Sequence, residues 1–145
     1  MKNLMSVILA VAALLIAGSA QAADRNWDFG SVWAISYAET KPGKFNDYMN
    51  DLNNVWRKFL EDEKATGDVL SYRVLQAAFP RDGEPDVIFL VEYKNYAAFD
   101  KGMEYFENQS KEIMGSVDEA MQAGIDREAI RALRGSLVAQ EIMLR

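Results

Sequence analysis

The sequence predicts an α+β fold in which a four-stranded antiparallel sheet is covered on one face by two helices. Segments whose residues alternate between two faces, as in β-strands, are interspersed with longer segments whose apolar residues recur every three or four positions, as in helices. The order of these segments is strand, helix, strand, strand, helix, strand, with one extra helical turn before the last strand. No linker or repeat divides them, so we expect a single domain.

The first strand is predicted over residues 32–38, and the first helix follows it directly. Pro42 fits the first turn of this helix, where a missing backbone N–H costs nothing. Gly67 stands where a left-handed residue ends a helix. The apolar positions of the helix form one stripe: Phe45, Tyr48, Met49, Leu52, Val55, Trp56, Phe59 and Leu60.

Two strands follow, over residues 69–78 and 87–93. The second of them is almost continuously apolar, which is typical of a strand buried on both faces. Asp82, Glu84 and Asp86 alternate in the turn between these strands, but their spacing lacks the full calcium-loop pattern. We interpret them as a solvated acidic turn.

The remainder is predicted to be helical up to the last strand. Asn95 can cap a second helix, Asp126 a short third helix, and Gly135 ends the helical part before a strand over residues 136–144. The second helix has a stripe made of Phe99, Met103, Phe106, Ile113, Val117 and Met121.

This order of elements is the split β-α-β plan of ferredoxin-like domains, in which the first and third strands are central. Two helices cover only one face of a four-stranded sheet, whereas the apolar third strand requires a cover on both faces. A second copy of the chain, packed sheet to sheet about a two-fold axis, is the simplest cover. We therefore predict a homodimer.

Two short motifs resemble the dimeric α/β-barrel superfamily. They are KPGKF at residues 41–45 and EYKNYAAF at residues 92–99. The first is similar to the helix start of the antibiotic-biosynthesis monooxygenase and NIPSNAP-like groups, and the second to the point where their second helix opens. The resemblance covers residues 32–144 and implies a dimeric α/β barrel. That superfamily includes cofactor-free monooxygenases, haem enzymes, isomerases and stress-responsive proteins.

The composition excludes several kinds of chemistry. The 145 residues contain no histidine and no cysteine, which removes thiolate chemistry, the usual nucleophile–base pairs and ordinary transition-metal sites. Haem-using members of the superfamily hold iron through a histidine, so we expect no cofactor and no metal. The formal net charge of −6 disfavours nucleic acid and anionic lipid as partners.

Residues 1–22 are predicted to be a secretory signal peptide. They combine an early lysine, an apolar run too short for a comfortable membrane span, and an Ala-Gln-Ala cleavage signature. Residues 23–31 are interpreted as an N-terminal arm, and residues 32–145 as the single ferredoxin-like barrel domain. We expect a periplasmic or secreted protein that has no membrane partner once the signal is removed.

The candidate ligand-binding residues all lie on predicted strands: Trp33, Tyr37, Tyr72, Arg73 and Glu92. If the aromatic side chains point away from the helices, they line the barrel and suit a flat aromatic ligand; if they point toward the helices, they belong to the core. The alternation of residues along a strand does not say which of its two faces the helices cover. Glu92 interrupts the most apolar strand, and is either a pocket carboxylate or the cross-strand partner of Arg73.

These observations predict an exported homodimeric α/β-barrel protein that binds a small apolar or aromatic molecule in its barrel. One alternative is a cofactor-independent monooxygenase or isomerase, in which Glu92, Tyr72 or Tyr37 moves protons. A second alternative is a stress-associated structural protein without a ligand. A cavity distinguishes these classes, since the structural protein requires a filled interior and polar groups that converge on a cavity favour an enzyme.

Overall fold

The computed structural model describes residues 25–145. Phe29–Met143 form one compact unit, and residues 25–28 with Leu144 and Arg145 are the described part of a second unit, so each is described by itself. The predicted signal peptide, residues 1–22, lies outside the described residues. Within residues 25–145, no helix has the length and apolar character needed to cross a membrane.

Four strands form one antiparallel sheet: β1 (Trp27–Thr40), β2 (Val69–Gln76), β3 (Val87–Tyr93) and β4 (Arg131–Leu144). Their order across the sheet is β2-β3-β1-β4, so the first and third strands are central, as predicted. β3 pairs antiparallel with both β1 and β2. This order confirms the ferredoxin-like plan.

The first and last strands start earlier than the sequence predicted. β1 begins at Trp27, so residues 27–31 of the predicted arm belong to the strand.

In the terminal unit, the Arg145 guanidinium donates two hydrogen bonds to the Asp28 carboxylate, at 2.8 and 2.6 Å. The backbone N–H of Arg145 also donates to the carbonyl of Asn26 at 2.8 Å. These contacts tie the two ends of the described chain together.

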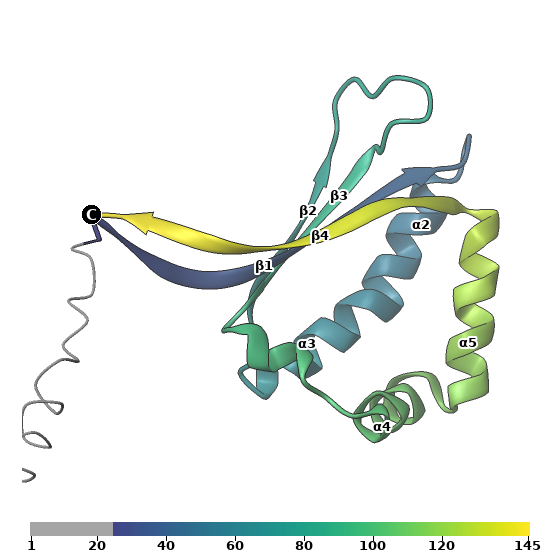
Figure 1. The fold of residues 1–145 in the computed structure, drawn as a ribbon. Helices are drawn as coiled ribbons and strands as arrows, with labels where there is room; N and C mark the ends of the chain where they lie inside the picture. Colours follow the sequence, from purple (N-terminus) through teal and green to yellow (C-terminus); the bar gives the residue numbers. More distant parts are fainter. Residues whose placement is uncertain (1–24) are drawn as a thin grey trace, which may run out of the picture. The chain divides into compact units, whose positions relative to one another are not determined.

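The helical segments follow β1 and β3 along the chain. The first contains α2 (Phe45–Asp51), the π-helical turn η1 (Leu52–Trp56) and α3 (Arg57–Ala65). The second contains η2 (Tyr96–Phe99), α4 (Met103–Met114), α5 (Val117–Asp126) and η3 (Arg127–Ala129). The labelled helices all lie on one side of the sheet (Figure 1). The other face has no helix over it in the described part of the chain.

The core lies between the sheet and the first helical segment. It consists of two clusters of buried side chains: Ala38, Tyr48, Leu52, Val87 and Phe89 in the first, and Leu60, Val69 and Val91 in the second. Trp56 packs against both clusters, with its ring edge-on to Phe89 (5.2 Å between centroids) and to Tyr72 (5.5 Å). The apolar stripe predicted for the first helix is therefore the stripe that packs on the sheet.

The strand register shows which residues share the opposite face of the sheet. Directly opposed residues on antiparallel strands point to the same side. Three cross-strand rows alternate with the core rows: Ser71–Glu92–Trp33, Arg73–Leu90–Ile35 and Leu75–Ile88–Tyr37. We call the face that these nine residues occupy the open face. It is mainly apolar, and no helix of Phe29–Met143 covers it.

The prediction that Pro42 lies in the first helical turn is wrong. α2 begins at Phe45, and Pro42 with Gly43 makes the turn before it, closed by a hydrogen bond from the Lys44 N–H to the Lys41 carbonyl (2.9 Å). Gly43 has φ +75°, as a Pro-Gly type II turn requires. The end of the first helical segment is as predicted: α3 ends at Ala65, and Gly67 follows with φ +83°.

The second predicted helix is not continuous. Asn95 is a cap, as predicted, and its side chain accepts the N–H of Ala97 at 3.0 Å, but it opens only the short turn η2. Gly115, with φ +95°, ends α4, and Ser116 caps α5 by accepting the N–H of Glu119 at 3.1 Å. The even apolar spacing of this region concealed the break that a left-handed glycine makes.

The short third helix predicted after Asp126 is the single 3₁₀ turn η3, and the last strand starts earlier than predicted. Asp126 occupies the N-cap position of η3 and is the last residue of α5, but its side chain makes no cap hydrogen bond: its carboxylate accepts from Gln122 at 2.8 Å. β4 begins at Arg131 and continues through Gly135, which has φ +102°. Glycine adopts positive φ at strand irregularities as well as at helix ends. The glycine at position 135 therefore did not distinguish a helix end from a strand irregularity.

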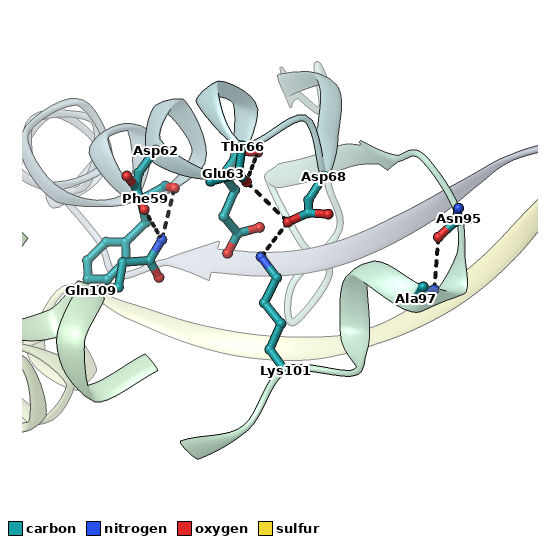
Figure 2. Close-up of polar contacts among 9 residues, drawn as sticks. All are labelled: Phe59, Asp62, Glu63, Thr66, Asp68, Asn95, Ala97, Lys101 and Gln109. Carbon is teal, nitrogen blue, oxygen red and sulfur yellow. Dashed lines mark hydrogen bonds and ion pairs between the residues drawn. The ribbon is translucent and has the colours of Figure 1, made fainter. Parts of the chain in front are cut away.

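Polar contacts hold the second helical segment against the first (Figure 2). Gln109 of α4 is buried, and its amide donates to the Asp62 carboxylate (2.8 Å) and the Phe59 carbonyl (3.5 Å) in α3. Lys101, just before α4, forms an ion pair with Asp68 (2.8 Å), just before β2. A buried amide is costly without partners, so these contacts fix how α4 sits on α3.

Candidate functional site

A cavity of about 380 Å³ lies on the helix side of the sheet. Its walls come from the first helical segment, from β1, β3 and the start of β4, and from Arg127 directly after α5. Its volume is within the range of pockets that hold small molecules. The cavity is therefore the candidate site of Phe29–Met143.

Aromatic side chains make up much of the wall. Trp56 and Phe59 come from the first helical segment, and Phe89 and Tyr93 from β3. Burial raises the pKa of Tyr93 to about 12, so its hydroxyl remains protonated at neutral pH. Such a wall suits a flat apolar ligand.

The π-helical turn η1 contributes three of the lining residues: Leu52, Val55 and Trp56. A π turn closes its hydrogen bonds over five residues rather than four, and is found mostly as single turns at functional sites. The sequence pattern did not reveal it, because the apolar steps of three and four are compatible with an ordinary α-helix.

Polar side chains gather at one part of the cavity wall. Arg127 donates from Nε to Oδ2 of Asp51 at 2.6 Å, and both side chains are largely buried. Tyr48 and Arg131 lie beside this pair, and the two interact through their side chains. Burial is the main cause that raises the pKa of Tyr48, while the Arg131 guanidinium opposes the rise. The Tyr48 hydroxyl therefore stays neutral and can donate a hydrogen bond.

This arrangement can bind a polar group at one part of an otherwise apolar cavity. It offers two guanidinium groups and a phenol as donors, and a single carboxylate, which Arg127 already engages. Among residues 25–145, no group of three or more acidic side chains is placed to hold a metal ion. The polar groups on this part of the wall supply hydrogen bonds and charge recognition.

The residues predicted to bind ligand do not line this cavity. Four of the five share the open face: Trp33, Tyr37, Arg73 and Glu92. Tyr72 lies on the helix face instead, where its ring contacts Trp56 and its hydroxyl donates to Glu61 of α3 at 2.5 Å. The aromatic strand residues are thus divided between the two faces of the sheet.

Glu92 is held by two serines rather than by Arg73. Ser31 Oγ donates to Glu92 Oε1 at 2.8 Å, and Ser71 Oγ donates to Oε2 at 2.6 Å. Arg73 lies in the next cross-strand row, opposite Leu90, and forms no ion pair with Glu92. The cross-strand pair considered from the sequence is therefore not formed in the described structure.

We expect a double-mutant cycle between Arg73→Ala and Glu92→Gln to show a coupling free energy within about 0.5 kcal/mol of zero. By contrast, Glu92→Ala removes the acceptor of the Ser71 hydroxyl and leaves Ser31 only its longer hydrogen bond to Glu141 (3.3 Å), and is expected to cost about 1–3 kcal/mol of unfolding free energy. Equilibrium urea unfolding measures both. A coupling of about 1 kcal/mol or more would show that the ion pair forms in solution.

Comparison with known proteins bears on the fold alone. No family model and no curated protein matches the chain. It is similar to the crystal structure of HapK from Hahella chejuensis, with a TM-score of 0.51 and 11% identity, over 76% of this chain and 91% of that one. It is also similar to a dimeric ferredoxin-like protein from an uncultured marine organism, with a TM-score of 0.50 and 8% identity, over 81% of this chain and 90% of that one. These similarities confirm a ferredoxin-like α+β fold, and fold does not by itself define an activity.

Proposed function

We propose that this protein is an exported homodimer whose protomers each bind a small, mainly apolar or aromatic molecule. The observation that carries the proposal is the cavity of about 380 Å³, which has aromatic walls and a few polar groups gathered in one place. The sequence predicted a ligand in the barrel and left open which face of the sheet lines it. We propose the cavity on the helix side of the sheet, because its volume and its lining suit a small molecule.

The open face supports the homodimer. Ile88 and Leu90 are only half-buried within one chain, and Leu75 in the same face is exposed. Large apolar patches are rare on the surface of monomers and mark interaction sites. A second copy of the sheet would cover the patch with a matching surface. One of the similar structures is described as dimeric.

The cavity also bears on the two alternatives. A structural protein without a ligand requires a filled interior, and the cavity argues against it. The convergence of Tyr48, Asp51, Arg127 and Arg131 favours a cofactor-independent monooxygenase or isomerase as the second candidate. However, Asp51 is the one carboxylate among the lining residues, and its bond to Arg127 leaves it poorly placed to accept a substrate proton. We therefore prefer binding over catalysis.

Native mass spectrometry tests the proposal in one experiment. The full sequence is expressed in a Gram-negative bacterium and the protein is recovered from the periplasm. We expect a dimer of chains that start at Ala23 or Asp24, with a small molecule retained without a covalent bond. An intact Met1 on the recovered protein would contradict cleavage of the signal peptide, absence of the protein from the periplasm would contradict export, and a monomer at micromolar concentration would contradict the dimer. A retained molecule that is chemically converted on incubation would favour the enzyme.

A further inference from the structure

The charges around the cavity leave one buried cation without a buried counter-ion. The charged residues of the wall are Asp51, Arg127 and Arg131, and the first two pair with each other at 2.6 Å. Within the described chain, Arg131 forms its ion pair with Glu128. The Arg131 side chain is only 9% exposed, whereas that of Glu128 is 66% exposed. The positive charge is therefore buried while its counter-charge is in water.

This separation is energetically unfavourable. A guanidinium taken out of water loses its hydration, and a solvated carboxylate repays only part of that loss. A guanidinium has five N–H donors, and the bond to Glu128 comes from one nitrogen, Nη1. The Tyr48 hydroxyl lies beside this guanidinium in the same wall, so two donors can converge on one acceptor group.

We infer that the cavity takes a planar aromatic molecule with a single anionic group, an aromatic carboxylate or sulfonate, with the anion at Arg131 and Tyr48 and the ring against Trp56 and Phe89. The inference rests on the proposed function of this cavity and adds the charge and shape of the ligand. An arginine fork matches the two oxygens of a carboxylate, and its hydrogen bonds are charge-assisted.

Neutral and cationic ligands fit the cavity less well. A neutral aromatic molecule would fill the apolar wall but leave Arg131 without a buried counter-ion, since its buried neighbour Tyr48 is uncharged. A cation would be repelled by the two guanidinium groups of the wall, and the charge of its one carboxylate, Asp51, is already paired with Arg127 through Oδ2. The chain as a whole is acidic, with a formal net charge of −6, so attraction for an anion has to come from local groups such as Arg131.

Isothermal titration calorimetry with two probes of the same shape tests the inference. The probes are 1-naphthoate, which is anionic, and 1-naphthalenemethanol, which is neutral. We expect the mature protein to bind 1-naphthoate about tenfold to a hundredfold more tightly, as charge-assisted hydrogen bonds at a desolvated site predict. Equal affinities for the two probes would overturn the inference and leave the proposed function standing.

Substitutions in the cavity wall then identify the side chains that cause the preference for the anion. Arg131→Gln is expected to remove the preference for the anion, and Tyr48→Phe to reduce it about threefold to tenfold. Arg131→Lys keeps the charge and is expected to keep part of the preference for the anion. This second variant tests the assignment even if Arg131→Gln fails to fold. The control is Arg134→Gln, on the same strand, where the side chain pairs with Glu39 and does not line the cavity.

The outcomes separate the two proposals. A preference for the anion that survives Arg131→Gln, or that is lost in Arg134→Gln, overturns the assignment to Arg131. Failure of both probes to bind, together with no small molecule retained in native mass spectrometry, overturns the proposed function itself.

Discussion

Truncation of Trp56 to alanine is expected to lower the free energy of unfolding by about 3–5 kcal/mol. Trp56 packs against both core clusters and stands edge-on to Phe89 and Tyr72. Its removal loses the transfer free energy of the indole and enlarges a cavity that already exists, which the surroundings cannot fill. Equilibrium urea unfolding measures the change, at one fixed protomer concentration because a dimer couples folding to association.

The matched control for Trp56 is Asn53, in the same π turn. Asn53 is exposed, and its side chain only accepts a hydrogen bond from Arg57 at 2.9 Å. Asn53→Ala should therefore change stability by no more than about 0.5 kcal/mol. Leu52→Ala, which empties a buried position, should cost about 2–5 kcal/mol. Similar losses at Asn53 and Trp56 would show that the buried side of the first helical segment has been misassigned.

Replacement of Leu90 by arginine is expected to convert the proposed dimer into a monomer. Leu90 lies on the central strand β3, and on the open face it stands between Ile35 and Arg73. In a two-fold interface the same patch meets itself, so one substitution places two unpaired guanidinium groups in the contact. Burial of an unpaired charge costs several kcal/mol, which is enough to dissociate an interface of standard size at micromolar concentration. Sedimentation equilibrium measures the change in mass.

The control for this experiment is Met103→Arg. Met103 begins α4 and is 77% exposed, so the same added charge should leave both the fold and the dimer unchanged. Circular dichroism of Leu90→Arg should show the secondary structure retained, because Leu90 is outside the two core clusters. A dimer that persists in Leu90→Arg would show that the open face is not the dimer interface.

Much of the fold could be predicted from local patterns. The apolar run of β3 indicated a central strand, and the stripe of the first helix indicated its buried side, because burial and periodicity are directly linked. Glycine was the ambiguous signal. Gly115 ends a helix and Gly135 lies within a strand, both with φ near +100°, and the residue type is the same in both cases.

The candidate site was less predictable, for two physical reasons. Alternation divides a strand into two faces but does not say which face the helices cover. In β2 the register also shifts between Val69 and Ser71, so that Tyr72 faces the helices and Arg73 faces away. The polar part of the cavity depends on the pair between Asp51 and Arg127, which are 76 positions apart in the chain. No local spacing rule connects residues at that separation.

Homologues of this chain are expected to differ in length within Leu52–Trp56. A π turn accommodates one more residue than an α turn, whereas an extra residue in an unbroken α-helix would rotate everything after it by about 100°. A homologue whose helix is α throughout should thus be one residue shorter here. An ungapped alignment would then set Trp56 against a residue from the solvent side. A gap at this place, more than identity at the aromatic positions, is the evolutionary marker by which chains with the same cavity wall can be distinguished.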